Sequence, residues 1–262
     1  MTTDQMPLAP RQLAQEVQPP LVRIIESPRR DWGMWLLLWV ALMGVSFALD
    51  GVVGSGLSLF QRGDLKRELA ALGQWGQVSS LVIVGVLLVC LQGRRWRRLL
   101  DLALAAGLTW FVSFLFKTGV GRLRPRLETP YWFEGYLVQA SDVAGHPGAP
   151  FSHYDLSSFP SSHTSAAMVL SLFVTLVWPR LWGFALAMLV LVGLSRYAFE
   201  AHWASDVLGG ATIGFLVGYP VLRGLFGVRL CDWVWKVLFN RGEAPAISDV
   251  VAAEHAALRR VD

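Results

Sequence analysis

The stretch Leu99–Pro125, LLDLALAAGLTWFVSFLFKTGVGRLRP, decides the fold, because an apolar run is followed at once by a cluster of cations and glycines. The apolar part, Leu99–Phe116, carries one acidic residue, Asp101, near its start. Its length is close to the roughly 20 residues that a helix needs to cross a bilayer. The stretch therefore predicts a membrane helix that ends in polar side chains at one membrane surface.

The composition of the whole chain agrees with a membrane protein. Of its 262 residues, 54% are hydrophobic and 16% are charged, whereas soluble domains carry about 25% charged residues. The mean hydropathy is +0.45. The net charge of +4 is modest and no basic stripe is visible, so we expect no nucleic-acid partner. Cys90 and Cys231 offer neither metal-ligand spacing nor a disulfide framework.

Six apolar runs approach the length of a membrane helix. They are Trp32–Leu49, Gly76–Leu91, Leu99–Phe116, Ser162–Trp178, Leu181–Arg196 and Asp206–Leu222. Pro179-Arg180 separates the fourth run from the fifth and predicts a tight turn. Six runs in one chain favour an all-α fold over a buried hairpin of a soluble protein. We expect a polytopic six-helix membrane bundle over residues 32–223.

The segments outside this bundle differ from it in composition. Residues 1–31 have mixed charge, several prolines and no apolar core of a signal peptide. We therefore expect a flexible cytoplasmic leader and an uncleaved first helix, and residues 224–262 are expected to form a cytoplasmic tail. The stretches Gln61–Trp75 and Arg229–Arg241 are amphipathic. Either could lie in the membrane surface or pack on the bundle.

The basic loops predict the orientation in the membrane. Cations precede the first run, separate the second from the third and the fourth from the fifth, and follow the sixth. Alternating helices put these loops on one side, which the positive-inside rule assigns to the cytoplasm. Cations also occur on the opposite side, which weakens the rule. We expect an inner-membrane protein with both termini in the cytoplasm.

Three polar clusters lie at the ends of apolar runs on the predicted non-cytoplasmic side. Lys117–Pro125 follows the third run, Pro160–His163 opens the fourth, and Ser195–Asp206 joins the fifth to the sixth. Alternating topology brings these distant segments to one membrane face. The predicted active site therefore lies at the non-cytoplasmic surface.

The clusters contain groups that suit a phosphate. Three cations are contributed by Lys117, Arg124 and Arg196. Each arginine can hold two oxygens at once. Ser161 and the backbone N–H groups of Ser162 and His163 lie at a predicted helix N-terminus, where free donors and the helix dipole favour anions. A doubly charged tetrahedral anion fits this set better than a carboxylate or a sulfate.

Two histidines and a carboxylate complete the set. His202 and Asp206 are four residues apart and share one face if a helix begins near His202. A carboxylate on one imidazole nitrogen would fix the tautomer and leave the other nitrogen free to attack. His163 is then available as a general acid. Three cations beside the histidines would repel a divalent ion, so we expect no metal and no cofactor.

The three clusters resemble the signature of the type 2 phosphatidic acid phosphatase (PAP2) superfamily, in its bacterial membrane lipid phosphatase branch. That signature reads Lys-x6-Arg-Pro, then Pro-Ser-Gly-His, then Ser-Arg-x5-His-x3-Asp. The matching residues are Lys117, Arg124, Pro125, Pro160, Ser161, His163, Ser195, Arg196, His202 and Asp206. Ser162 stands where the signature has Gly. The resemblance covers about 99–220.

This resemblance implies a metal-independent lipid phosphate phosphatase. His202 would attack phosphorus and form a phosphohistidine, Asp206 would orient it, and His163 would protonate the leaving group. The residues implied to hold the phosphoryl oxygens are Lys117, Arg124, Ser161, Ser162 and Arg196. Arg122 is expected to be a neighbouring surface cation or a further phosphate contact. Ser162 keeps the backbone donor of Gly but is strained if the position needs a positive φ.

Several alternatives stay open at this point. A lipid phosphotransferase on the same scaffold would begin with the same histidine attack, and a membrane anion transporter would also need cations, although here they lie at one face. The sequence does not separate phosphatidic acid, phosphatidylglycerol phosphate, polyprenyl diphosphate and lipid A as substrates. The segment between Arg126 and Phe159 is rich in aromatic residues and is expected to form an interfacial lid. These residues are Tyr131, Trp132, Phe133, Tyr136, Phe151 and Tyr154.

Overall fold

The computed structural model describes residues 32–53, 63–127, 131, 133, 154–239, 249–253 and 256. Its main helices are α3 (Trp32–Val53), α4 (Gly63–Leu72), α5 (Val78–Leu91), α6 (Arg98–Val120), α7 (Ser162–Val177), α8 (Trp182–Ala198), α9 (Ala204–Arg223) and α10 (Phe226–Phe239). Short 3-10 turns are η2 (Gly73–Gly76), η3 (Gly93–Arg95), η4 (Pro125–Leu127) and η6 (Pro179–Leu181). Within these residues the sole β feature is an isolated bridge between Arg122 and Phe133. The predicted all-α fold is confirmed for this part of the chain.

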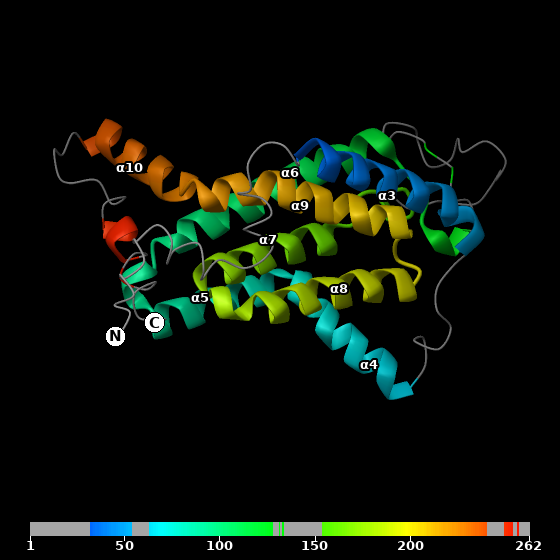
Figure 1. The fold of residues 1–262 in the computed structure, drawn as a ribbon, viewed down its shortest axis with the longest axis horizontal. Coiled ribbons are helices and arrows are strands. Elements are labelled where there is room, and N and C mark those ends of the chain that lie inside the picture. Colours follow the sequence, from blue (N-terminus) through cyan, green and yellow to red (C-terminus); the bar gives the residue numbers. More distant parts are fainter. Residues whose placement is uncertain are drawn as a thin grey trace, which may run out of the picture.

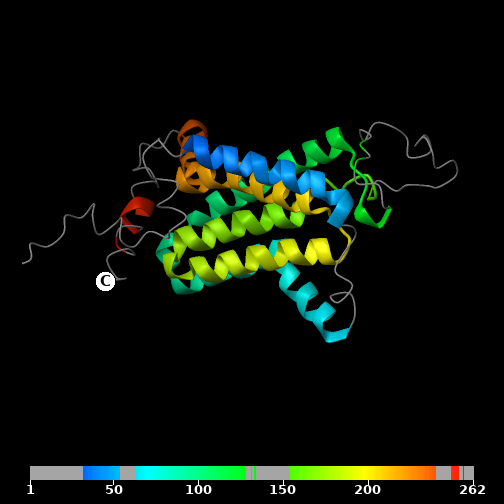
Figure 2. The ribbon, with the colours of Figure 1, turned by 45° about the vertical axis from the view of Figure 1, so that its right-hand side comes forward.

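The long helices run side by side along the longest axis of the molecule (Figure 1). Helix α7 lies in the middle and packs against α6, α8 and α9. Its side chains Val169, Leu170 and Phe173 are fully buried, which accounts for a helix that is apolar nearly all round. Figure 2 shows α3 alongside α9 on one flank of this bundle. The indole of Trp39 on α3 donates to Thr212 Oγ1 on α9 at 2.8 Å and ties the two together.

Close backbone contact between α7 and α9 depends on Gly210. A Cβ added there would lie 2.3 Å from the carbonyl oxygen of Ser161, a distance that no side chain can occupy. The backbone N–H of Ser161 also donates to the carbonyl oxygen of Asp206 at 3.0 Å. The start of α7 is therefore fixed against the start of α9, where two of the predicted polar clusters meet.

Some of the described helices are candidate membrane spans by length and composition. In the described part of the chain, three helical stretches are long and apolar enough to cross a membrane: Arg98–Val120, Pro179–Ala198 and Ala204–Arg223. Residues 63–76 and 78–91 pass the same test together, but the chain bends by 65° between them. Ser162–Val177 and Leu37–Gly51 are apolar but shorter.

The two amphipathic stretches both form helices. Within Gln61–Trp75, the described residues 63–75 lie in α4 and η2, and α4 points away from the bundle at the end where α8 and α9 are joined (Figures 1 and 2). Helix α10 extends past the other end, and its Trp233 and Leu238 are 61% and 68% exposed. The predicted leader, residues 1–31, lies outside the described residues.

The acidic residue in the third apolar run, Asp101, is explained by the start of α10. Its carboxylate accepts the backbone N–H groups of Gly227 and Val228 at 2.8 and 3.1 Å. It also pairs with Arg98 at 3.0 Å, and both side chains are buried. A carboxylate is a strong acceptor for free N–H groups at a helix N-terminus. This pair therefore has a structural role at the end of the bundle opposite to the polar clusters.

Candidate active site

The three polar clusters converge on one cavity of about 340 Å³. It is lined by Lys117, Arg124, Tyr154, Ser157, Ser162, His163, Arg196, Ala201 and His202. Lys117 comes from the last turn of α6, His163 from the first turn of α7 and Arg196 from the last turn of α8. The short loop between α8 and α9 supplies Ala201 and His202. Convergence of the clusters, which we predicted from alternating helices, is thus a feature of the fold.

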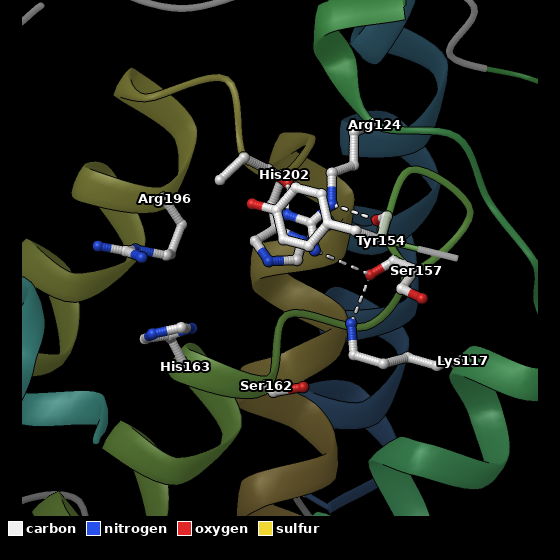
Figure 3. Close-up of a pocket in the computed structure, with 9 residues that line it drawn as sticks. Lys117, Arg124, Tyr154, Ser157, Ser162, His163, Arg196 and His202 are labelled. Atoms are coloured by element: carbon white, nitrogen blue, oxygen red, sulfur yellow. Dashed lines mark hydrogen bonds between the residues drawn. The ribbon is translucent and has the colours of Figure 1, made fainter. Parts of the chain in front are cut away.

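The cations surround His202 on two sides (Figure 3). Arg196 and His163 lie on one side of the cavity, Lys117 and Arg124 lie on the other, and the His202 ring lies between them. Among the described residues that line the cavity, three are cations and none is a carboxylate. Such a cavity attracts an anion, and the flat guanidinium groups suit the oxygens of a phosphate.

Main-chain carbonyl groups hold Arg124 in place. Its Nε donates to the carbonyl oxygen of Tyr154 at 2.7 Å, and one Nη donates to that of Ala201 at 2.6 Å. The guanidinium carbon lies 3.7 Å from the centre of the Tyr154 ring, within the range of a cation–π contact. Arg124 therefore joins the segment before α7 to the loop that carries His202.

The Ser157 carbonyl oxygen connects the two cations on this side of the cavity. Lys117 Nζ donates to it, and a second Nη of Arg124 donates to it at 3.4 Å (Figure 3). A neutral carbonyl is a weaker partner for a cation than a charged oxygen. A phosphate oxygen, which carries negative charge, is therefore a stronger acceptor for these two donors than the Ser157 carbonyl is.

The imidazole of His202 is fixed by a carbonyl oxygen. Its Nδ1 lies 2.7 Å from the carbonyl oxygen of Ser158. A carbonyl can only accept, so Nδ1 carries the proton and Nε2 keeps its lone pair. Burial, and then the charges of Arg124 and Lys117, hold the pKa of His202 well below its ordinary value of 6.5. The ring is therefore neutral and nucleophilic at neutral pH.

Asp206 reaches His202 through Ser158, which differs from the direct contact that the spacing predicted. Its nearest carboxylate oxygen lies 3.9 Å from His202 Nδ1, beyond hydrogen-bond distance. That oxygen instead accepts the hydroxyl of Ser158 and the backbone N–H of Trp203. The two side chains do lie close together, although His202 precedes α9 and shares no helical face with Asp206. The segment before α7 inserts a carbonyl between them. Sequence reasoning missed Ser158 because a main-chain acceptor has no side-chain signature.

Arg122 is buried, and its interpretation as a surface cation is wrong. Its side chain is 1% exposed, and it does not line the cavity. One Nη donates to Asp206 at 2.6 Å, and the other donates to Asp50 at 2.8 Å. Asp50 lies near the end of α3. No motif surrounds Asp50 in the sequence, so its part in the site could not be predicted.

The two serines of the second cluster have different positions. Ser161 is fully buried, and its Oγ accepts the backbone N–H of Thr164 at 3.4 Å and the Thr164 hydroxyl at 2.9 Å. It caps α7 and is not among the residues that line the cavity, whereas Ser162 is. Ser162 is the first residue of α7 and is not among the described non-glycine residues with positive φ. Serine in place of the glycine of the signature is therefore unstrained.

His163 packs under the break between η2 and α5. Gln77, which lies at this break, has its side-chain nitrogen 3.4 Å from His163 Nε2. A Cβ added at Gly76 would lie 2.2 Å from the carbonyl oxygen of His163, so only glycine permits this approach. The break between η2 and α5 thus packs against His163 without lining the cavity, a feature that the apolar pattern of the second run did not predict.

The described residues thus form a helical bundle with candidate membrane spans and a cavity lined by two histidines and three cations. Comparison with known protein families then gives a match. The description of the PAP2 superfamily matches residues 98–229, just over half of the chain. The chain belongs to the PAP2 superfamily. The resemblance noted from the three motifs is therefore confirmed.

The curated relatives that match are phosphatases. A lipid A 1-phosphatase of Rhizobium etli is 25% identical over 207 residues, which cover 71% of this chain and 82% of that protein. A candidate undecaprenyl-diphosphatase of Escherichia coli, YbjG, is 31% identical over 97 residues, covering 36% of this chain and 43% of that one. Among solved structures, a transmembrane PAP2-type phosphatidylglycerolphosphate phosphatase of Bacillus subtilis matches with a TM-score of 0.47 and 22% identity. That match covers 74% of this chain and 92% of the other.

Proposed function

We propose that this protein is an integral-membrane lipid phosphatase that hydrolyses a phosphomonoester or diphosphate lipid through a phosphohistidine at His202. One observation carries the proposal: a neutral imidazole with a free Nε2 lines a cavity among three cations, where apolar helices end. The phosphatase names of the relatives support the reaction class, and their lipid substrates support a lipid phosphate.

The first half of the reaction transfers the phosphoryl group to the protein. Lys117, Arg124, Arg196 and the N–H groups at the start of α7 hold the phosphate oxygens as negative charge spreads over them. His202 Nε2 attacks phosphorus, an N–P bond forms, and the P–O bond to the lipid breaks. His163 gives its proton to the leaving oxygen. A phosphomonoester lipid then departs as the alcohol, and a diphosphate lipid departs as the lipid monophosphate.

The second half returns the protein to its starting state. Water attacks phosphorus and gives a proton to His163, the N–P bond breaks, and inorganic phosphate leaves. The phosphorylated ring of His202 carries positive charge, which the Ser158 carbonyl and the carboxylate of Asp206 behind it stabilise. Every step is balanced by groups of this chain, so we propose that the enzyme needs no metal. Ser161 serves this chemistry as the cap that fixes the α7 N-terminus.

The proposal includes a topology. The six helices α3, α5, α6, α7, α8 and α9 cross the inner membrane, with the cavity on the non-cytoplasmic side and both termini in the cytoplasm. The position of Arg95, Arg98 and Arg180 at the helix ends opposite to the cavity supports this. Reporter fusions at Gly93 and at Gly145, which lies outside the described residues, should report cytoplasm and exterior respectively. The reverse pattern would contradict this orientation.

We also propose that the substrate enters from the bilayer. Of the expected aromatic lid, Tyr154 lines the cavity, and Tyr131 and Phe133 contact Phe47 of α3 with ring centres 5.4 and 5.8 Å apart. The other three aromatic residues lie outside the described residues. Each CH₂ of a lipid tail that leaves water then adds about 0.8 kcal/mol of binding free energy.

A chain-length series of phosphomonoesters tests this function. Purified protein in detergent should release inorganic phosphate without an added acceptor lipid, and kcat/KM, corrected for partition into micelles, should rise steeply with tail length. Phosphate transfer only to an acceptor lipid would identify a phosphotransferase instead. A flat series, or equal efficiency on a soluble sugar phosphate, would contradict the lipid substrate.

A further inference from the structure

The buried network around Arg122 connects α3 to the candidate nucleophile. Arg122 binds Asp50 with one Nη and Asp206 with the other, and the side chains of all three are at most 1% exposed. The hydroxyl of Ser205 donates to Asp50 and accepts from Arg122. Asp50 lies in α3, 72 residues before Arg122. A residue outside the family match at 98–229 is thus part of the surroundings of the site.

Arg122 and Asp206 hold Ser158 from two directions. The carbonyl oxygen of Arg122 accepts the backbone N–H of Ser158 at 3.0 Å, and Asp206 accepts the Ser158 hydroxyl. The remaining polar group of Ser158, its carbonyl oxygen, accepts the Nδ1 proton of His202. The orientation of the imidazole therefore depends on where Arg122 and Asp206 place this one residue.

Aromatic rings keep water from the guanidinium of Arg122. The rings of Phe47, Phe133 and Trp203 have their centres 5.2, 5.4 and 5.6 Å from its central carbon. Charges interact more strongly where water is excluded. The position of Asp206 is therefore sensitive to a change in the charge or length of Asp50, which binds the other side of the same guanidinium group.

This network is difficult to explain by stability alone. A buried ion pair gains little over well-packed apolar residues, because both charges lose their hydration. The network also does not line the cavity and so does not contact the phosphate. What it does contact is the one residue that fixes His202.

We propose that Asp50 and Arg122 are positioning residues for His202, so that α3 completes the active site of this enzyme. The inference rests on the proposed function, in which His202 Nε2 attacks phosphorus. Asp50 fixes Arg122, Arg122 fixes Asp206, and Asp206 with the Arg122 backbone fixes Ser158. Loss of Asp50 should disturb the attack on phosphorus and leave the cations that bind phosphate in place.

Vanadate and phosphate together separate these two effects. Phosphate binds through its oxygens to the cations, whereas vanadate also bonds to the attacking nitrogen and resembles the transferring group. In Asp50→Asn, which keeps the size of the side chain, kcat should fall about 10²-fold, while KM and the affinity for inorganic phosphate change little. The affinity for vanadate should fall in parallel with kcat. Ser158→Ala removes only the hydroxyl that Asp206 accepts. It should lower kcat and the vanadate affinity in parallel too, but by a smaller factor.

Asp101→Asn is the matched control, because it makes the same change in the buried pair with Arg98 at the opposite end of the bundle. It should lower thermal stability and leave kcat and both affinities of the folded protein unchanged. Binding of inorganic phosphate and of vanadate is measured directly, without lipid. An error in the proposed lipid substrate would therefore appear only as absent turnover by the wild-type protein. Wild-type kcat in Asp50→Asn, or equal weakening of phosphate and vanadate, would overturn the inference. If Asp50→Asn does not fold, Ser158→Ala decides by the same criteria.

Discussion

Gly76 lies where η2 packs against the backbone of His163, and its replacement by alanine tests whether this contact positions His163. The added Cβ would lie 2.2 Å from the carbonyl oxygen of His163 and 2.9 Å from its carbonyl carbon. Ordinary contact begins at 3.4 Å, and both neighbours are backbone atoms that cannot rotate away. The turn η2 and the first turn of α7 must therefore separate by about 1 Å.

This displacement has two expected costs. Forced overpacking of this kind destabilises a protein by about 1–3 kcal/mol. A shift of about 1 Å in a catalytic group lowers the rate about 10²-fold, and His163 is the group that moves. Gln77 moves with η2, so its contact with His163 Nε2 is lost as well.

The assay is phosphate release from a lipid phosphate, with the thermal midpoint measured on the same preparation. Gly119→Ala is the matched control, because Gly119 also lies near the site end of a helix but a Cβ there meets no atom within 4 Å. It should keep wild-type kcat and gain up to about 1 kcal/mol of stability from the helix propensity of alanine. A folded Gly76→Ala protein with wild-type kcat/KM would refute the claim that η2 positions His163.

Three further predictions concern the chemistry. His163→Ala should lower kcat/KM, which reports phosphoryl transfer to His202 and not the later hydrolysis, about 10²–10⁴-fold for alkyl phosphates. The loss in kcat/KM should be far smaller for nitrophenyl phosphate, whose leaving group needs no proton; equal losses would contradict a general acid. The pKa of His202 is lowered by burial and by Arg124 and Lys117, and only the neutral ring attacks. Activity should therefore persist as the pH falls through 6.5, the ordinary pKa of histidine, and decline only at lower pH. A kcat/KM profile whose acid limb lies at or above pH 6.5 would contradict the lowered pKa of His202. Finally, turnover should persist in excess chelator, and loss that Mg²⁺ or Zn²⁺ restores would contradict the metal-free mechanism.

The features that the sequence could predict are local ones. Apolar runs mark the helices because burial in lipid requires an apolar side chain at nearly every position. The motif residues Lys117, His163, Arg196 and His202 all line the cavity, because each motif lies at a helix end and alternating helices bring such ends together. Helix count and motif spacing were enough to predict this convergence.

The features that it could not predict depend on contacts between distant segments. Arg122 and Arg124 are two residues apart in one motif, yet only the second lines the cavity. Arg122 instead pairs with Asp206 and with Asp50. Asp50 lies in α3, far from the three motifs, and has no motif around it. The contact between Ser158 and His202 uses a carbonyl oxygen, a group that every residue carries, so no pattern of side chains indicates it.

Isolation of the phosphorylated protein tests the central claim most directly. A lipid labelled in its terminal phosphate is mixed with the enzyme and quenched within milliseconds in alkali, because the N–P bond of phosphohistidine is labile in acid, and the labelled peptide is then sequenced. We predict label on His202, formed before inorganic phosphate appears and absent from His202→Ala, which should also lose turnover. Label on another residue, or normal turnover by His202→Ala, would contradict the assignment of His202 as the nucleophile.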